Sequence, residues 1–452
     1  MGKYFGTDGI RGKANSGAMT PSFVTKIGQA FALTLKNQYP KPRVILGKDT
    51  RISGYMIEGA LIAGLNSMGV DVLVVGPLPT PGIAYLTRGM RAEGGIVISA
   101  SHNTYSDNGI KLFDNNGFKL PSTIEEQIEN FIDDPDLEKH LVHSAKMGRA
   151  KRIDDALGQY SVFLKEGFPK SLNLVGKRII LDCANGAGYR VAPKVFSELG
   201  AEVISIHDEP NGLNINENCG ALHPEILQEK VKLYKADIGI ALDGDADRIV
   251  LCDEKGEILD GDQIIALCAL MFKSKGLLIS NTICVTVMSN KGLDVCMQEA
   301  GIKVIRSQVG DKYVMEEMRK QNLILGGEQS GHILFLNSST TGDAIIAALK
   351  VLEIMCDKNQ PLSLISQIMQ KFPQYTHNVS VTHKPKIESL VKTTQALKVF
   401  EEELGQKGRI LLRYSGTESL ARITLEGPFL DRLVKIAQEI EEIFTCELKE
   451  TQ

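Results

Sequence analysis

One arrangement of segments occurs three times in the chain, and it limits the possible folds more than any other feature. In each copy an apolar strand is followed by a polar or glycine-containing turn, a helical stretch, a glycine and a second apolar strand. The glycines Gly69, Gly200 and Gly301 stand where a helix commonly ends. The expected strands are residues 43–46 and 70–75, 178–181 and 201–206, and 283–287 and 302–305. The repeat predicts three related α/β domains.

The expected strands are almost continuously apolar, which indicates sheets covered on both faces, as in parallel βαβ layers. The tail of the chain differs from this pattern. It reads as a strand at 377–381, a helix at 390–404, two strands around RYSGTES and a closing helix at 430–444. We therefore predict a smaller α+β domain after the three α/β domains. The expected boundaries of the four domains are 1–154, 155–255, 256–370 and 371–452.

Charge and composition exclude several classes of protein. The 452 residues carry a net charge of −4 and no basic stripe, which argues against a nucleic-acid or anionic-membrane surface. No run of 18 apolar residues occurs, and the N-terminus MGKYFGTDGIRGK lacks the apolar segment of a secretory signal. The eight cysteines show no C-x-x-C or zinc spacing. We expect a cytoplasmic protein with free thiols and with neither a nucleic-acid nor a membrane partner.

The first loop that can carry chemistry is SASHNTYSDNGIKLF, at residues 99–113. It follows an apolar strand at 95–98, so Ser101 is expected at the carboxyl end of a strand, where open α/β sheets bind ligands. His102 and Lys111 place a titratable group and a cation beside this hydroxyl. Read alone, the loop is more typical of a solvated polar turn.

The second loop is DGDADR, at residues 243–248, after the apolar strand 238–242. Asp243, Asp245 and Asp247 repel one another unless a cation lies between them. Hard oxygen ligands favour Mg²⁺ or Ca²⁺. An EF-hand is excluded, because Arg248 occupies the position that such a loop reserves for glycine and the flanks read as strands. A solvated acidic turn remains the alternative.

The third loop, GGEQSGH, lies at residues 326–332, between expected strands at 323–325 and 333–336. Glu328 and Ser330 suit sugar hydroxyls, His332 is a candidate acid or base, and the glycines let backbone approach a ligand. Read alone, the segment is also an ordinary glycine-rich hairpin.

The fourth loop, RYSGTES, lies at residues 413–419. Arg413 and Arg422 can fork onto phosphate oxygens. Ser415, Gly416 and Thr417 have the composition of an anion-binding nest of hydroxyls and successive backbone N–H groups. A plain β-turn is the alternative.

Together, in this order, the four loops resemble those of the α-D-phosphohexomutase superfamily over essentially the whole chain. YFGTDGIRG at residues 4–12 and GGEQSGH are similar to the bacterial phosphoglucosamine mutase branch. The resemblance implies mixed α/β sheets and four domains around a central cleft.

The resemblance also implies a role for each loop. Ser101 would be the phosphorylated nucleophile and, with Asp243, Asp245 and Asp247, would hold one Mg²⁺ per chain. Charge stabilisation and proton transfer would involve Arg11, Lys111, His332 and Arg248. Glu328 and Ser330 would bind the sugar. The residues that would hold the non-reacting phosphate are Arg413, Ser415, Gly416, Thr417 and Arg422.

The implied reaction interconverts glucosamine 6-phosphate and glucosamine 1-phosphate and feeds UDP-N-acetylglucosamine and cell-wall precursor synthesis. Glucosamine or glucose 1,6-bisphosphate would be the intermediate and activator. A kinase or autophosphorylation would prime Ser101, and the protein would be a monomer or a homodimer. The alternatives are a phosphomannomutase or phosphoglucomutase of the same superfamily, a metal-dependent sugar phosphatase and a non-catalytic sugar-phosphate sensor.

Overall fold

The computed structural model describes residues 2–415 and 419–450. Its contacts divide the chain into two compact units. The first comprises Met1–Met288 and Val304–Gln367, and the second Ser289–Lys303 and Ile368–Gln452. Among the described residues, no helix has both the length and the apolar character needed to cross a bilayer.

The first unit begins with a six-stranded mixed sheet in the order β1-β5-β4-β2-β3-β6. The strands β4, β2, β3 and β6 pair in parallel, while β5 runs antiparallel to both β4 and β1. The bounds are β1 (Ile10–Lys13), β2 (Arg43–Lys48), β3 (Asp71–Pro77), β4 (Gly94–Ile98), β5 (Asp107–Phe113) and β6 (Ala150–Arg152).

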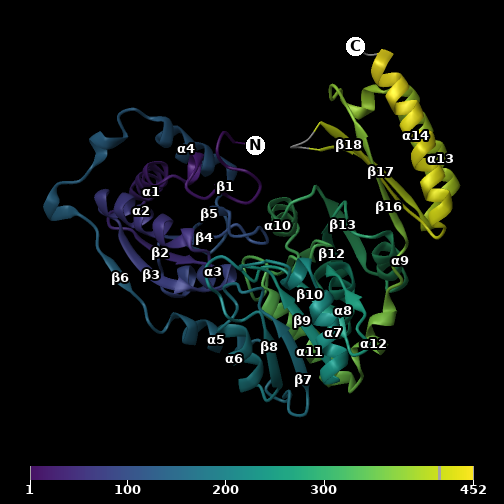
Figure 1. Ribbon diagram of the computed structural model, residues 1–452, viewed down its shortest axis with the longest axis horizontal. Helices are drawn as coiled ribbons and strands as arrows, with labels where there is room; N and C mark the ends of the chain where they lie inside the picture. Colours follow the sequence, from purple (N-terminus) through teal and green to yellow (C-terminus); the bar gives the residue numbers. More distant parts are fainter. Residues whose placement is uncertain (1, 416–418, 451–452) are drawn as a thin grey trace. The chain divides into compact units, whose positions relative to one another are not determined.

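Helices cover both faces of this sheet, as the continuous apolar strands predict. Val44 and Leu46 of β2 share a core with Leu61 of α2, on the side where α1, α2 and α4 gather (Figure 1). Ile45 is buried on the opposite face, where α3 contacts β2 and β4. The bounds are α1 (Pro21–Lys36), α2 (Ser53–Ser67), α3 (Thr80–Gly89), α4 (Ser122–Asp133) and α5 (Ala156–Glu166).

A second mixed sheet has the order β11-β10-β9-β7-β8. The strand β7 pairs in parallel with β8 and β9, and β10 returns antiparallel to β9. The bounds are β7 (Arg178–Asp182), β8 (Glu202–Ile206), β9 (Ile238–Leu242), β10 (Ile249–Asp253) and β11 (Ile258–Leu259), with α6 (Val191–Glu198), α7 (Glu225–Tyr234) and α8 (Gly261–Ser274).

A third sheet has the order β13-β12-β14-β15, with β12 parallel to β14 and β15 antiparallel to β14. Its strand β14 lies two residues further along the chain than the sequence predicts and includes Gly326 and Gly327. A side chain at Gly326 would stand 2.5 Å from the carbonyl oxygen of Cys284, so only glycine allows this pairing. The bounds are β12 (Thr282–Thr286), β13 (Lys303–Ser307), β14 (Leu325–Gly327), β15 (Ile333–Phe335), α10 (Asp311–Lys320), α11 (Ala344–Lys358) and α12 (Leu362–Ile365).

The glycines that were expected to end the helices of the repeat have the required conformation. Their φ angles are +85° at Gly69, +104° at Gly200 and +61° at Gly301. A left-handed residue at this place satisfies carbonyl groups of the last helical turn and lets the chain turn back into the next strand.

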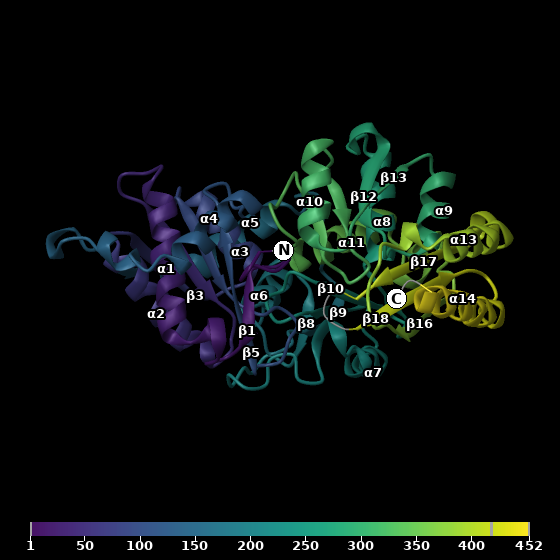
Figure 2. The same cartoon turned by 90° about the horizontal axis from the view of Figure 1, so that it is seen from above.

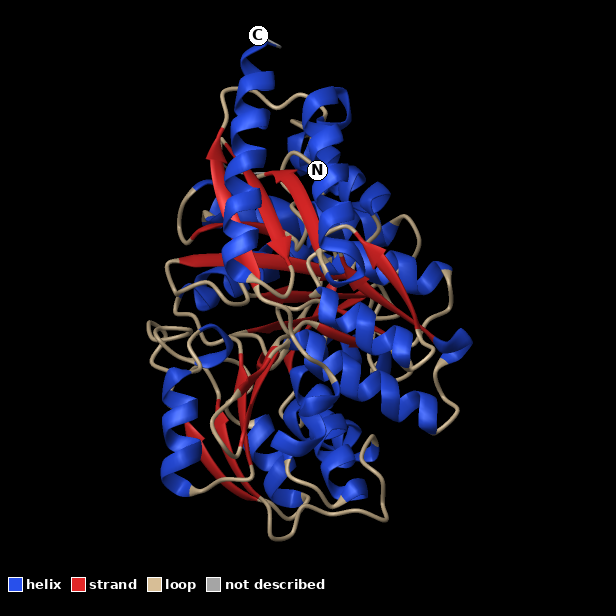
Figure 3. Ribbon diagram, turned by 90° about the vertical axis from the view of Figure 1, so that its right-hand side faces the viewer, coloured by secondary structure: helices blue, strands red, loops and turns tan. Residues whose placement is uncertain are grey.

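The second unit is an antiparallel sheet with the order β16-β18-β17, covered by α13 and α14. The long helix α14 lies against the strands, and Ile436 and Ile440 pack with Ile423 of β18 (Figures 2 and 3). The predicted order of elements in the tail is confirmed. The bounds are α9 (Lys291–Glu299), β16 (Gln374–Ser380), α13 (Val391–Leu404), β17 (Arg409–Tyr414), β18 (Leu420–Glu426) and α14 (Leu430–Glu450).

Candidate active site

Three of the four sequence loops occupy equivalent places in the first unit. Each joins a strand that has a parallel neighbour to the antiparallel strand that follows it. The loops are residues 99–106 between β4 and β5, 243–248 between β9 and β10, and 328–332 between β14 and β15. Carboxyl ends of parallel strands are the usual place for ligands in such sheets.

The first loop places the Ser101 hydroxyl beside the second loop, residues 243–248. Ser101 is buried and has a φ of +51°, unusual for a residue with a side chain. Its backbone N–H donates to Ser99 Oγ at 2.9 Å, and its Oγ donates to Asp243 Oδ2 at 2.7 Å. His102 Nδ1 lies 3.4 Å from the same hydroxyl. Burial, followed by the charges of Arg248 and Arg11, lowers the pKa of His102 to about 4, so this imidazole is neutral at pH 7.

The three aspartates of the second loop form one cluster. Each offers an oxygen within 4.8 Å of the others, and all three are buried. In the described chain neither Asp245 Oδ1 nor Asp247 Oδ1 has a hydrogen-bond partner, although both atoms are buried. A buried carboxylate oxygen without a hydrogen bond is costly. The three acids with a serine oxygen form a hard donor set that fits Mg²⁺.

The charges within the cluster shift the pKa values of Asp243 and Asp247 in opposite directions. Burial, together with the charges of Asp247 and Asp245, raises the pKa of Asp243 well above its usual range. Burial also opposes ionisation of Asp247, but Lys111 and His332 outweigh it and hold the pKa of Asp247 well below the usual range. A divalent cation at the cluster would stabilise the ionised form of every member.

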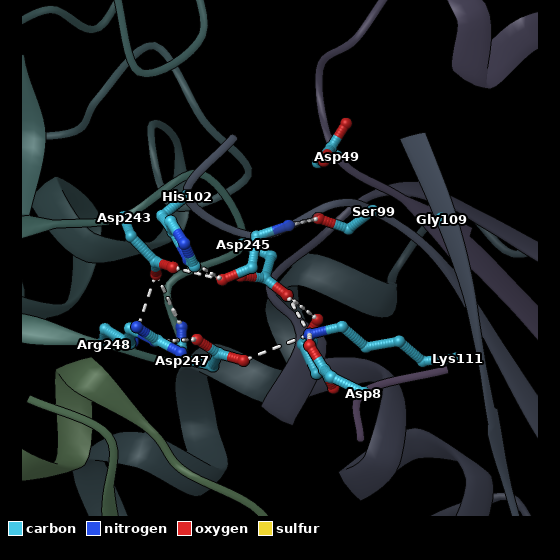
Figure 4. A network of polar contacts seen from close by, with 12 residues as sticks. Asp8, Asp49, Ser99, His102, Gly109, Lys111, Asp243, Asp245, Asp247 and Arg248 are labelled. Atoms are coloured by element: carbon cyan, nitrogen blue, oxygen red, sulfur yellow. Dashed lines mark hydrogen bonds and ion pairs between the residues drawn. The ribbon is translucent and has the colours of Figure 1, made fainter. Parts of the chain in front are cut away.

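Lys111 of β5 supplies a buried cation to the same cluster. Its Nζ lies 2.9 Å from Asp245 Oδ2, 3.2 Å from Asp247 Oδ2 and 3.1 Å from Asp8 Oδ2 (Figure 4). Burial lowers the pKa of Lys111, but the three carboxylates raise it well above its ordinary value. The side chain is therefore a fixed positive charge. Thr80 Oγ1 adds a hydrogen bond of 2.6 Å to Asp245 Oδ2.

A second array of charges lies beside this one, and the sequence did not predict most of it. Asp8 forms ion pairs with Arg11 and Lys119 as well as with Lys111. Lys119 also pairs with Asp311, at the start of α10. Burial raises the pKa of Asp8, but Lys111, Lys119 and Arg11 hold it well below its usual range. Asp8 thus balances three cations at the edge of the aspartate cluster.

The third loop reaches the second through its backbone and through His332. Arg248 forms a β-bridge with His332, and a side chain at Gly331 (φ +91°) would stand 2.0 Å from the carbonyl oxygen of Ile249. His332 Nδ1 lies 3.7 Å from Asp247 Oδ1, and Nε2 lies 3.6 Å from Asp311 Oδ2. Burial lowers the pKa of His332, but the two carboxylates outweigh it and raise the pKa above 6.5.

The two residues expected to bind a sugar belong to this loop. Glu328 is buried, and its Oε1 accepts from the Gly310 N–H at 3.2 Å. Ser330 Oγ donates to Glu328 Oε2 at 3.4 Å. Burial lowers the pKa of Arg248, but the carboxylates of Asp247, Asp243 and Glu328 outweigh it and raise this pKa. The loop therefore presents an acceptor and a hydroxyl beside the aspartate cluster.

The fourth loop belongs to the second unit. Arg413 and Arg422 are direct partners on the neighbouring strands β17 and β18. Burial and the charge of Arg422 lower the pKa of Arg413, which indicates that an anion would stabilise the pair. Lys384 Nζ donates to the Ser415 carbonyl oxygen at 2.6 Å. Gly416 and Thr417, expected in the same nest, lie outside the described residues.

The sequence interpretation gave no role to Asp8, Lys119 and Asp311. Asp8 lies within YFGTDGIRG, so its position in a recognised motif was the available signal. Lys119 and Asp311 stand outside the four loops and meet only because the fold joins positions 192 residues apart. No local pattern marks such a pair.

Models of known families match nearly the whole chain. All four describe phosphoglucomutase/phosphomannomutase. The alpha/beta/alpha domains I, II and III match residues 2–139, 160–256 and 260–372, and the C-terminal domain matches residues 377–443.

Two relatives are similar over their full length. Phosphoglucosamine mutase of Pelobacter propionicus is 51% identical over 453 residues, covering 100% of both chains. Phosphoglucosamine mutase of Geobacter metallireducens is 52% identical over 443 residues, covering 98% of both.

Solved structures share the fold at lower identity. A phosphoglucomutase/phosphomannomutase family protein of Burkholderia thailandensis has a TM-score of 0.81 at 23% identity, covering 98% of this chain and 97% of that one. N-acetylphosphoglucosamine mutase of Aspergillus fumigatus, in complex with GlcNAc-6P and magnesium, has a TM-score of 0.66 at 16% identity, covering 98% and 96%. By its sequence and its four matched domains, the chain belongs to the phosphoglucosamine mutase family of α-D-phosphohexomutase isomerases.

Proposed function

We propose that this enzyme interconverts glucosamine 6-phosphate and glucosamine 1-phosphate through a phosphorylated Ser101. The observation that carries the proposal is the 2.7 Å contact between Ser101 Oγ and Asp243, within a buried aspartate cluster in which two described oxygens accept no hydrogen bond. The choice of sugar follows from the phosphoglucosamine mutases that are 51–52% identical to the chain.

The reaction is two phosphoryl transfers with one bound intermediate. A free hydroxyl of the substrate attacks the phosphorus on Ser101, the bond from phosphorus to Ser101 Oγ breaks, and a 1,6-bisphosphate forms. The hydroxyl proton passes to a base, a task for which we propose His332. The bisphosphate then turns over, Ser101 Oγ takes the other phosphoryl group, and a proton returns to the oxygen that is left behind.

Most of the catalysis must come from charge and positioning. Enzymes accelerate hydrolysis of phosphate monoesters by up to ~10²¹-fold. Acid–base help contributes only ~10²–10⁴-fold, so fixed cations around the transferring group must provide much of the rest. Lys111, Arg11 and Arg248 provide such charges. Asp243, Asp245, Asp247 and phosphorylated Ser101 would hold one Mg²⁺, which when bound neutralises phosphate oxygens.

The remaining roles concern binding. Glu328 and Ser330 would bind the sugar hydroxyls, and Arg413, Ser415, Gly416, Thr417 and Arg422 the phosphate that does not react. Glucose 1,6-bisphosphate, which a structure of the A. fumigatus enzyme contains, is a candidate activator besides the glucosamine compound. We place the enzyme in the cytoplasm, as a monomer or a homodimer primed by a kinase or by autophosphorylation, feeding UDP-N-acetylglucosamine and cell-wall precursor synthesis.

The test replaces the nucleophile and a neighbouring serine. Ser101→Ala should abolish isomerisation and the single added phosphate in the intact mass, while thermal unfolding stays near that of the wild type. Ser106→Ala is the control, because Ser106 is exposed in the same loop and its hydroxyl contacts Thr104. Retained turnover by Ser101→Ala with added 1,6-bisphosphate would refute the covalent scheme. Chelation of Mg²⁺ should stop the wild type, and Mg²⁺ should restore it.

A further inference from the structure

Two side chains that have no part in the proposed chemistry hold the backbone of the serine loop. The carbonyl oxygen of Ser101 accepts hydrogen bonds from Arg51 Nη2 at 3.1 Å and from Asn216 Nδ2 at 2.8 Å. The carbonyl oxygen of Asn103 accepts from the same two groups, with Asn216 Nδ2 at 2.8 Å. Two donors thus bridge both carbonyl groups that flank the turn after Ser101.

The two donors lie in loops that follow strands of different sheets. Arg51 follows β2, is 0% exposed and forms an ion pair with Asp49. Asn216 follows β8, is 6% exposed, and is itself held by a hydrogen bond of 3.0 Å from its N–H to the Ala184 carbonyl oxygen. Both residues are therefore buried, and each has a further contact besides those to the serine loop.

The serine loop needs such support because of its backbone conformation. A non-glycine residue at a φ of +51° is strained and persists only where its surroundings enforce it. The direction of Ser101 Oγ depends on this backbone. The loop at residues 243–248 closely approaches the same carbonyl group. A side chain at Gly244 would stand 2.6 Å from the Ser101 carbonyl oxygen and 2.7 Å from Asn216 Nδ2.

We propose that Asn216, together with Arg51, is a positioning residue that fixes the backbone of Ser101 so that its Oγ faces Asp243. This inference rests on the proposed role of Ser101 as the phosphorylated nucleophile. Asn216 follows β8, which belongs to the same sheet as the strands β9 and β10 that flank residues 243–248. It therefore connects the backbone of Ser101 to the part of the chain that carries the aspartates. A displacement of about 1 Å in such an arrangement costs ~10²-fold in rate.

The chemistry at position 216 is specific to an amide. One nitrogen with two N–H groups serves two carbonyl oxygens at equal distances. Aspartate has the same shape but would place an oxygen against both carbonyl oxygens and repel them. Asn216→Asp therefore reverses the contact without changing the volume of the side chain.

Asn214 supplies a matched control from the same loop. Its Nδ2 donates to the Glu209 carbonyl oxygen at 3.0 Å, and its Oδ1 accepts from the Asn211 N–H at 2.9 Å. These contacts stabilise the loop itself. Asn214→Ala should weaken the loop after β8 without altering the backbone at residues 101–103. Asn216→Ala removes the contacts to that backbone.

The experiment measures kcat and KM, and also the single-turnover rate at which glucose 1,6-bisphosphate phosphorylates position 101. Intact mass follows the phosphorylation, and all measurements are made below the unfolding temperature. Asn216→Asp should lower kcat and the phosphorylation rate by on the order of 10²-fold, with KM little changed. Asn216→Ala should lower them by roughly tenfold, and Asn214→Ala should remain near the wild type. If Asn216→Asp fails to fold, Asn216→Ala decides.

A wild-type phosphorylation rate in the Asn216 variants would overturn the inference. So would an equal loss of rate in Asn214→Ala, because the effect would then reflect stability of the loop alone. A wild-type enzyme that never carries phosphate at position 101, or an active Ser101→Ala variant, would instead count against the proposed function.

Discussion

Asp343, the first residue before α11, is a buried acid whose charge is held by hydrogen bonds. Tyr160 OH donates to Oδ2 at 2.6 Å, and the N–H groups of Ile345 and Ile346 donate to Oδ1 at 3.0 Å. Burial raises the pKa of Asp343 to about 6, because these donors offset only part of the desolvation. Asp343 therefore titrates at higher pH in the folded chain than in the unfolded chain.

The sign of the resulting pH dependence follows from linkage. Between about pH 4 and pH 6 the folded state binds the Asp343 proton more tightly than the unfolded state does. Its contribution to stability is thus complete below pH 4 and is lost as the pH rises through 6. Relative to Asp343→Asn, the wild type should lose about 3 kcal/mol of unfolding free energy from pH 4 to pH 7, at 1.36 kcal/mol per pKa unit.

Denaturant unfolding of both proteins across this pH range checks the prediction. Parallel curves for the two proteins would contradict it. Tyr160→Phe serves as a second variant, since it removes a donor that lowers the pKa of Asp343 and should move the midpoint to higher pH.

Single residues were predictable from sequence only where a contiguous motif contained them. Ser101 and the three aspartates were candidates because chemistry and spacing mark their loops, and the structure places them together. Asn216, Lys119 and Asp311 were missed, because the contacts of Asn216 with Asn103 and of Lys119 with Asp311 span 113 and 192 residues and their own neighbours show no pattern. Their functions depend on distance in space, which spacing along the chain does not encode.

At the scale of elements, the repeat that was predicted from the sequence did not include the hairpin that follows it in each copy. It captured a strand, a helix and a second strand in each copy, whereas the candidate site residues lie in the hairpins β4–β5, β9–β10 and β14–β15. The glycines of β14 also obscured that strand, because Gly326 is needed for close pairing although glycine normally disfavours strands. Strands with apolar side chains were located well.

The helix pair α1 and α2 offers a test of close packing. A side chain at Gly64 would stand 2.3 Å from the Thr25 carbonyl oxygen across the helix interface. Alanine usually stabilises a helix by up to ~1 kcal/mol over glycine, but overpacking costs about 1–3 kcal/mol. Gly64→Ala should therefore lower the free energy of unfolding, while kcat of the folded enzyme stays unchanged.

Gly59 provides the control for this substitution. It lies on the exposed side of the same helix, and nothing among the described atoms approaches a side chain built there within 4 Å. Gly59→Ala should raise the melting temperature slightly. Equal shifts in the melting temperatures of the two variants would show that helix propensity, not packing, controls this site.

At the scale of the whole chain, the candidate residues divide between the two compact units. Ser101, the aspartate cluster and His332 belong to the first, while Arg413 and Arg422 belong to the second. The second unit includes residues 289–303 in addition to the tail, a grouping that only long-range contacts reveal. We therefore expect substrate affinity and metal binding to respond separately to substitution.

Arg413→Ala tests this division of work. Arg413 stands opposite Arg422, and their mutual repulsion favours a bound phosphate. A hydrogen bond to a charged group contributes about 1.5–3 kcal/mol, so KM should rise roughly 10- to 100-fold. The Mg²⁺ concentration for half-maximal activity and the phosphate content at Ser101 should stay at wild-type values.

Arg432→Ala is the control, because Arg432 is an arginine of the same unit that pairs with Glu403 and Glu439. A Mg²⁺ requirement that rose in step with KM would show that the second unit also supports the metal site, and an unchanged KM would remove Arg413 from the phosphate site.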